Sequence, residues 1–226
     1  MHDGWIEFSQ VAVAHLLAVA SPGPDFAIVL KQSLVHGRRT AVWTSVGIGT
    51  AILLHVGYSL FGLGLLIRSS EVWFAAVKYA GAAYIAWLGV QSLRAKPRAG
   101  GGGRSADAGE RSWEGGDRGS EEGRGMPTAR AAFATGFLTN ALNPKATLFF
   151  ISLFAMVVSP ATPKWVQAGY GLWMAVATMA WFALVSVGFT RVDVRERFLR
   201  HGHWIDRALG VVFLAFAVSL VRATVG

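Results

Sequence analysis

Six long apolar runs dominate this chain, and they constrain its fold more than any other feature. Each is long enough for a helix that crosses a hydrocarbon core of about 30 Å, which takes about 20 residues. The runs cover residues 5–30, 41–67, 72–93, 131–158, 165–189 and 204–221. None shows strand-like alternation over its length. The sequence therefore predicts an all-α integral membrane protein with six transmembrane helices rather than a barrel.

The composition agrees with a membrane protein. Hydrophobic residues make up 53% of the chain and charged residues only 15%, whereas soluble proteins carry about 25% charged residues. Tryptophans stand near the ends of several runs, where an amphipathic ring settles at the lipid headgroups: Trp5, Trp43, Trp73, Trp165 and Trp204. The absence of cysteine excludes disulfides, thiolate metal sites and cysteine nucleophiles.

The first apolar run superficially resembles a secretory signal peptide, because residues 18–20 read Ala-Val-Ala. A signal peptide begins with a positively charged region. This run instead carries Asp3 and Glu7, with no Lys or Arg before or within its first part. We therefore predict that it is the first membrane helix and that it is not cleaved.

Lys and Arg are distributed unevenly among the predicted loops. The three odd-numbered loops hold fifteen of them, whereas the two even-numbered loops hold only Arg68 and Lys164. Cytoplasmic loops of membrane proteins carry the excess of positive charge. We therefore expect a multi-pass protein of the cell (inner or plasma) membrane with cytoplasmic odd loops and both termini outside. This bias also accounts for the net charge of +8 without a nucleic-acid partner.

Residues 94–130 differ in composition from the rest of the chain. They contain ten glycines, eight Lys or Arg and six Asp or Glu. Such a segment buries too little apolar area to offset its ordering entropy. It is predicted to be a disordered cytoplasmic linker between a first half, residues 1–93, and a second half, residues 131–226. It lacks the spacing of a phosphate-binding loop.

The first apolar run of each half contains a proline break. Residues 21–25 read Ser-Pro-Gly-Pro-Asp, and residues 140–145 read Asn-Ala-Leu-Asn-Pro-Lys. Proline removes a backbone donor from a helix, and in lipid the freed backbone groups need protein or cavity water as partners. Two halves of three spans each insert in opposite orientations. The pattern predicts a 3+3 inverted repeat whose broken first and fourth helices line a binding cavity.

Asp25 and Lys145 stand beside the two breaks, inside otherwise apolar runs. A charge at the centre of a membrane helix costs at least about 2.5–3.5 kcal/mol. The two residues either form a structural ion pair between the halves or face a wet cavity and bind a charged ligand. The candidate substrate-binding residues all belong to the breaks: Pro22, Gly23, Pro24, Asp25, Asn140, Asn143, Pro144 and Lys145.

Two residues outside the breaks are further candidates. His55 lies inside the second run and is a candidate proton relay, with simple packing as the alternative. Tyr84 lies inside the third run and is either a wall of the pocket or an ordinary packing aromatic.

Several of these segments resemble the LysE/RhtB family of amino-acid exporters. The similar segments occur in the family's order, over its first four helices: 21–25 with Gly37-Arg38-Arg39, Gly47-Ile48-Gly49, Gly81-Ala82-Ala83-Tyr84, Trp87-Leu88-Gly89, Phe133, Gly136-Phe137, Asn140 and Asn143-Pro144-Lys145. The last two runs carry no diagnostic motif. The long Gly/Arg linker departs from the short loop of the family.

The resemblance implies a secondary active transporter that exports small amino acids, such as threonine, homoserine or a basic amino acid, from the cytoplasm. Export would be driven by an ion gradient. In this interpretation the substrate ammonium meets Asp25, and the substrate carboxylate meets Lys145 and free amides at a half-helix N-terminus.

Other function classes fit the sequence less well. A divalent metal-cation exporter of the same superfamily is the main alternative, but only His201 and His203 are closely spaced histidines. An enzyme is not expected, because the breaks offer no Ser–His pair and His-Glu-x-x-His is absent. No phosphate-binding loop supports a primary pump. We expect a transporter with the lipid bilayer and an amino acid as partners, no cofactor and no metal site; the sequence leaves homo-oligomerisation open.

Overall fold

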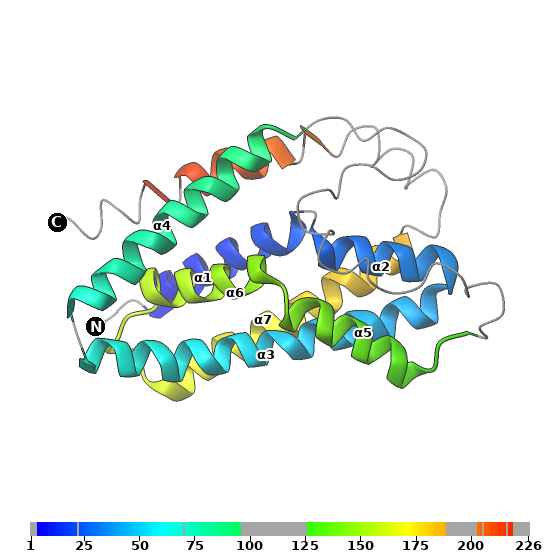
Figure 1. Ribbon diagram of the computed structural model, residues 1–226, viewed down its shortest axis with the longest axis horizontal. Helices are drawn as coiled ribbons and strands as arrows, with labels where there is room; N and C mark the ends of the chain where they lie inside the picture. Colours follow the sequence, from blue (N-terminus) through cyan, green and yellow to red (C-terminus); the bar gives the residue numbers. More distant parts are fainter. Residues whose placement is uncertain are drawn as a thin grey trace.

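A computed structural model of the chain, shown in Figure 1, describes residues 4–21, 23–69, 71–95, 126–188, 203–204, 206–215 and 217–218. Nearly all of the described residues are helical. The helices are α1 (Gly4–Ala20), α2 (Pro24–Val35), α3 (Arg38–Ser69), α4 (Glu71–Leu93), α5 (Ala129–Ala141), α6 (Pro144–Met156) and α7 (Lys164–Gly188). The described residues of 203–218 are also helical.

The helices occupy the predicted apolar runs, and an all-α membrane fold is confirmed. Residues 38–62 of α3 and 164–188 of α7 are each long and apolar enough to cross a membrane. Helices α1 and α2 pass the same criterion together and are bent by 53° at the break between them. The full set of six spans stays a prediction. Most of the predicted linker, residues 96–125, lies outside the described residues.

The end of the first broken span is later than the sequence predicts. Hydropathy falls after residue 30, yet α2 continues to Val35. The polar residues Gln32 and Ser33 lie on the buried face of α2. The Ser33 hydroxyl donates a 2.7 Å hydrogen bond to the Ser186 carbonyl of α7, so its polar group is satisfied on the buried face of the helix. The chain then turns at Gly37, whose φ of +82° is in the left-handed region that favours glycine.

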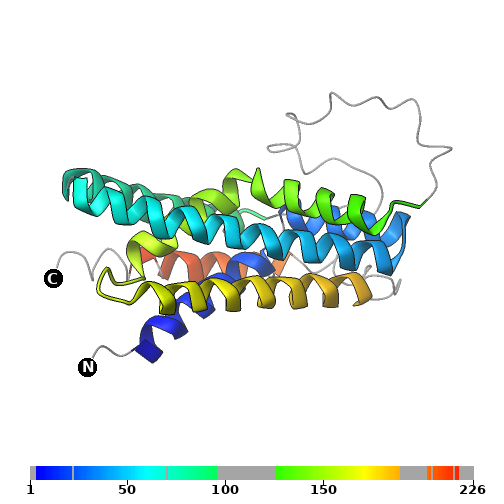
Figure 2. The same ribbon diagram turned by 90° about the horizontal axis from the view of Figure 1, so that it is seen from below.

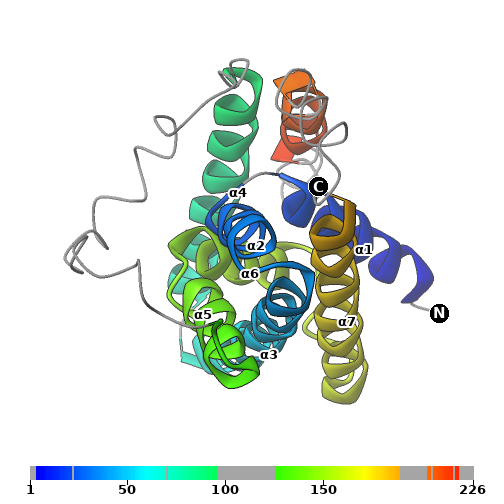
Figure 3. The same ribbon diagram turned by 90° about the vertical axis from the view of Figure 1, so that its right-hand side faces the viewer.

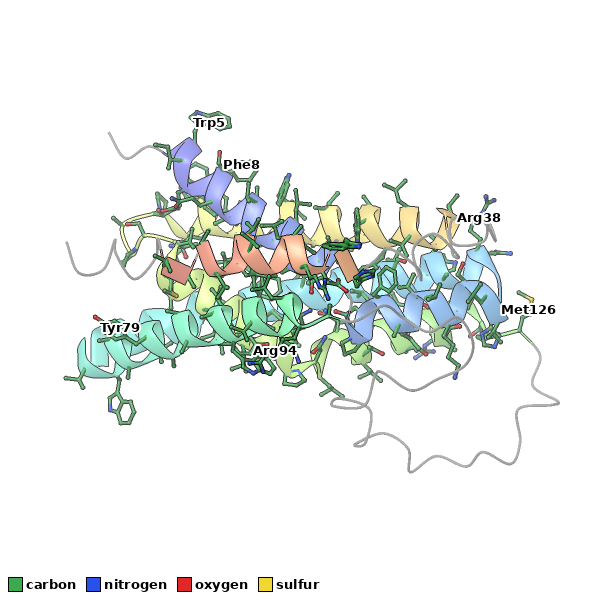
Figure 4. The ribbon with its side chains drawn as sticks, turned by 90° about the horizontal axis from the view of Figure 1, so that it is seen from above. Trp5, Phe8, Arg38, Tyr79, Arg94 and Met126 are labelled. Atoms are coloured by element: carbon green, nitrogen blue, oxygen red, sulfur yellow. The ribbon has the colours of Figure 1, made fainter. Side chains whose placement is uncertain are left out.

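Polar side chains lie inside the helical bundle, and large apolar ones cover its outside. His15, His55 and Asn140 are among the largest fully buried side chains. Many leucines and valines are exposed, and so are the five predicted anchors Trp5, Trp43, Trp73, Trp165 and Trp204. Figure 4 shows the Trp5 side chain pointing away from the bundle. This distribution suits a lipid environment, because an exposed apolar surface of this extent is rare on soluble monomers.

Helix α3 is the central element of the bundle. It contacts α2, α4, α5, α6 and α7, and Figure 3 shows it between α5 and α7. In Figure 2, α3 and α7 both follow the long axis of the molecule. The closest approach is to α5. A Cβ atom added to Gly47 would lie 2.1 Å from the Phe133 carbonyl oxygen, and a Cβ atom added to Gly136 would lie 2.0 Å from the Thr44 carbonyl oxygen. Glycine at both positions lets the two backbones touch.

The two breaks are built alike. Both α2 and α6 begin with proline at the first helical position, where its missing N–H removes no intrahelical bond. Gly23 caps α2, and Asn143 caps α6. The Asn143 side-chain oxygen accepts a 2.9 Å hydrogen bond from the Lys145 backbone N–H. Each proline thus ends one helical segment and starts the next, as expected from the sequence.

Candidate substrate-binding site

Two asparagines of the second break hold the carboxylate of the first. The Asn140 side-chain amide donates a 2.9 Å hydrogen bond to Asp25 Oδ2, and the Asn143 amide donates a longer one of 3.4 Å to the same oxygen. Asn140 is at the end of α5, and Asn143 precedes α6. The carboxylate therefore bridges the two ends of the broken span in the other half of the chain.

Lys145 makes the reciprocal connection. Its ammonium, on the first turn of α6, donates a 3.2 Å hydrogen bond to the Ser21 hydroxyl between α1 and α2. Its side chain also lies over Gly23, whose added Cβ would be 3.4 Å from Lys145 Nζ. Each break thus provides one charged side chain, which forms hydrogen bonds with polar side chains of the other break. The bonded residues are more than a hundred positions apart in the sequence.

The two charges do not neutralise each other by direct contact. In the described part of the chain, no ion pair within 4.0 Å joins Asp25 to Lys145, although they are close enough to attract each other electrostatically. Asp25 Oδ1 is buried and has no hydrogen-bond partner among the described residues. Asp206, in the last helical segment, also attracts Lys145 electrostatically. The site therefore contains an ammonium and a carboxylate oxygen that remain available to a ligand.

A cavity of about 50 Å³ lies between the breaks. This volume holds a few water molecules, because a single water needs about 10–15 Å³ on this measure. Its walls include six of the eight predicted binding residues: Gly23, Pro24, Asp25, Asn140, Asn143 and Lys145. Of the other two, Pro144 starts α6 outside the lining, and Pro22 lies outside the described residues.

His55 does not line this cavity but contacts Asn140, which does. Its Nε2 is 3.1 Å from both the backbone oxygen and Oδ1 of Asn140. Both atoms are acceptors, so Nε2 carries the ring proton and Nδ1 accepts from the Tyr58 hydroxyl. The result is a directed chain of hydrogen bonds from Tyr58 through His55 and Asn140 to Asp25. His55 is thus not among the lining residues; it orients the amide that binds the carboxylate.

Tyr84 also lies outside the lining. Its hydroxyl donates a 3.3 Å hydrogen bond to the backbone carbonyl of Lys145, and its ring stacks against Trp87 with 5.7 Å between ring centroids. It therefore supports the first turn of α6 from α4.

His15 and Thr178 line the cavity, and sequence reasoning did not select either as a site residue. His15 lies on α1 and Thr178 on α7, and their side chains are 2.9 Å apart at His15 Nε2 and Thr178 Oγ1. The two residues are separated by 163 positions in the sequence. The available signal was a histidine inside an apolar run, the same signal that selected His55.

The metal-ligating residue types are not clustered in the described ranges. No group of three or more His, Asp or Glu side chains there could hold a metal ion. Of the closely spaced pair noted in the sequence, His203 is described and buried, and His201 lies outside the described residues.

Comparison with known proteins gives a match over most of the chain. The family model described as "LysE type translocator" matches residues 16–224. The threonine efflux protein of Escherichia coli (strain K12) is 29% identical over 214 residues, which cover 95% of this chain and 97% of the relative.

Two further relatives match over similar lengths. The homoserine/homoserine lactone efflux protein of Salmonella typhimurium is 31% identical over 220 residues, covering 96% of each chain. The uncharacterized membrane protein YahN of Escherichia coli (strain K12) is 27% identical over 209 residues, or 89% of this chain and 82% of the relative. No solved structure matches significantly.

Proposed function

We propose that this chain, which belongs to the LysE type translocator family, is a secondary active transporter that exports small amino acids from the cytoplasm. Relatives named as efflux proteins for threonine and for homoserine support this class of substrate. The structural observation that supports it most is the placement of Asp25 and Lys145 on one cavity without an ion pair between them. Opposite charges held apart in this way match the two charges of an amino acid.

The substrate carboxylate binds at Lys145. This residue is on the first turn of α6, where the helix dipole is positive and disfavours a cation. An incoming carboxylate gains from the ammonium and from the helix N-terminus together. The neighbouring residue Ala146 lines the cavity at the third position of α6, where a backbone N–H has no intrahelical partner. That amide is the second donor for the carboxylate.

The substrate ammonium binds at Asp25 Oδ1, the carboxylate oxygen that accepts no hydrogen bond from a described residue. Asn140 and Asn143 hold the other oxygen in place. The cavity has room for only a few waters, so it must widen to admit an amino acid. Movement of the broken helices, which carry every charged group of the site except Asp206, supplies that widening.

The packing of the helices supports two inverted halves. In an inverted repeat, α1 and α2 of the first half correspond to α5 and α6 of the second, and α3 corresponds to α7. The contact between α3 and α5 then has its counterpart in the contact between α7 and α1. The contact between α3 and α6 likewise has a counterpart between α7 and α2. Both counterpart contacts are present. This correspondence supports a 3+3 repeat in which export proceeds by rocking of the halves about the central site.

The orientation in the membrane follows from the charged loops. Figure 4 shows Arg38, in the first loop region, and Met126, at the end of the third, at the same end of the molecule. Trp5 and Tyr79 lie toward the other end. This arrangement supports the first loop and the end of the third on one side, and the positive charge of the odd loops makes that side the cytoplasm. In this orientation both termini lie outside, and an ion gradient supplies the energy for export.

The metal-cation alternative has no observation in its favour. Metal binding would leave Lys145 as a cation beside the ligands, where it repels the ion. No cluster of metal-ligating side chains is found in the described ranges.

The experiment that tests the proposal is efflux from proteoliposomes preloaded with a panel of amino acids and, separately, with divalent cations. We expect threonine or a similar small amino acid to leave faster than from protein-free vesicles, in a manner that depends on an imposed ion gradient. Efflux of a divalent cation without efflux of any amino acid would overturn it.

A further inference from the structure

One buried polar atom, on a residue that lines the cavity, has no role in the binding mode above. His15 is 1% exposed, its side chain lines the cavity, and its Nδ1 has no hydrogen-bond partner among the described residues. Buried polar atoms in folded proteins are almost always hydrogen-bonded, so an unpaired one calls for an explanation.

The other ring nitrogen determines what Nδ1 can do. His15 Nε2 lies 3.1 Å from the Met174 carbonyl oxygen and 2.9 Å from Thr178 Oγ1. The Met174 carbonyl can only accept, so in the neutral ring Nε2 carries the proton. Nδ1 then has a free lone pair and is an acceptor. It needs a donor from a molecule that enters the cavity.

The position of the ring is fixed by its neighbours. The Phe150 ring is 5.9 Å away and the Trp173 ring 6.1 Å away, measured between ring centroids. With Nε2 bound to α7, the ring has little freedom to turn Nδ1 toward another protein group. The acceptor, on a residue of the cavity lining, is thus held in place before the substrate arrives.

We propose that His15 is the residue that selects amino acids with a hydroxyl group on a short side chain. This inference rests on the proposed function, which assigns the substrate ammonium to Asp25 and the carboxylate to Lys145. The remaining donor on a small hydroxy amino acid is its side-chain hydroxyl, and it donates to His15 Nδ1. Thr178 acts as a positioning residue, because it holds Nε2 and so sets the orientation of the ring.

Threonine and valine separate this role from general binding, because they have nearly the same shape and differ in one hydroxyl. An apolar pocket discriminates weakly between such isosteres, whereas a polar atom left without its partner discriminates strongly. We expect wild-type protein in proteoliposomes to export threonine at least about tenfold more efficiently than valine.

Two substitutions at His15 test the acceptor itself. In His15→Gln the terminal amide reaches the position of Nε2 and keeps the contact with α7, but no acceptor remains at the position of Nδ1. In His15→Asn the carbonyl oxygen falls near the position of Nδ1. We expect His15→Gln to export both amino acids at similar rates and His15→Asn to retain part of the preference for threonine. His36→Gln is the matched control, because His36 contacts Gln32 away from the cavity, and its preference should equal that of wild type.

Several results would overturn the inference. If wild-type protein exports threonine and valine with nearly equal efficiency, the inference is wrong, even if no variant folds. A His15→Gln variant that keeps the wild-type ratio, or one in which both amino acids slow equally, also overturns it. Each of these leaves amino-acid export itself intact. If wild-type protein exports no amino acid at all, the proposed function fails and this inference falls with it.

Discussion

The Asn140 side-chain amide donates a 2.9 Å hydrogen bond to Asp25, and this contact joins the ends of two broken helices that are 115 residues apart in sequence. Asn140 is itself held by His55, through two 3.1 Å contacts at Nε2. The carboxylate at the centre of the site therefore depends on a histidine that is not among the residues lining the cavity.

Replacing His55 should weaken transport without unfolding the protein. His55→Phe keeps a ring that can stack on Phe150, which lies 5.4 Å away and parallel, but removes both nitrogens. The Asn140 acceptors then lose a partner, which costs about 1–3 kcal/mol. We expect efflux of the substrate to fall by about tenfold to a hundredfold, measured as kcat/KM in proteoliposomes.

Tyr58→Phe is the milder control for this prediction. It removes the hydroxyl that donates to His55 Nδ1 and leaves the His55–Asn140 contact in place. Its effect should be clearly smaller than that of His55→Phe. Equal efflux by wild type and His55→Phe would show that His55 only fills space.

The contact between α3 and α5 should tolerate no side chain at its closest point. In Gly136→Ala the new Cβ would lie 2.0 Å from the Thr44 carbonyl oxygen, a backbone atom that cannot move without displacing α3. Overpacking of this kind costs about 1–3 kcal/mol or more. We expect a marked fall in the Tm of the detergent-purified protein and a loss of monodisperse material on size exclusion.

Gly57→Ala is the matched control on α3, because nothing lies within 4 Å of the added Cβ. Alanine has a higher helix propensity than glycine by about 1 kcal/mol. This variant should therefore be as stable as wild type or slightly more so. If Gly136→Ala and Gly57→Ala have the same Tm, the close approach of α3 and α5 is wrong.

The positive-inside bias predicts opposite locations for the linker and the C-terminus. The chain contains no cysteine, so single cysteines report without background. In intact cells an impermeant thiol reagent should label Val225→Cys and should not label Gly102→Cys until the membrane is opened. Labelling of Gly102→Cys from outside would reverse the assigned orientation.

The Gly-rich linker should be dispensable for transport. Its composition gives it little apolar area to bury, and shortening a loop changes its closure entropy only slightly. Deleting residues 98–125 should leave expression and efflux near wild-type levels. A deletion variant that inserts but no longer exports would assign this segment a functional role.

Much of the helical framework could be predicted from the sequence, because proline and hydropathy act locally. Pro24 and Pro144 each start a helix where a break was expected, since proline fits the first helical position and not the interior. The end of α2 was not predictable in this way. Ser33 lowers the local hydropathy, but a carbonyl of α7 accepts its hydroxyl, so this polar side chain can lie on the buried face of the helix.

The charged core of the site was also visible in the sequence, whereas its supporting residues were not. Asp25 and Lys145 are charges inside apolar runs, which is a strong local signal. His15 was passed over because its importance depends on Thr178 in the last described full helix, 163 residues away. His55 was selected, but its partner Asn140 gives it a positioning role that no spacing rule reveals.

The most direct test of the central claim is the efflux of substrate by Asp25→Asn, Lys145→Met and the double variant in proteoliposomes, with Tm measured on the same preparations. Removing one of two interior charges that attract each other leaves the other uncompensated, whereas removing both can be nearly neutral. We therefore expect each single variant to lose efflux and stability. The double variant should regain stability and still export nothing, because the substrate has lost both of its counter-charges. A double variant that regains wild-type efflux together with stability would show that the two charges serve the fold alone, and would contradict the account.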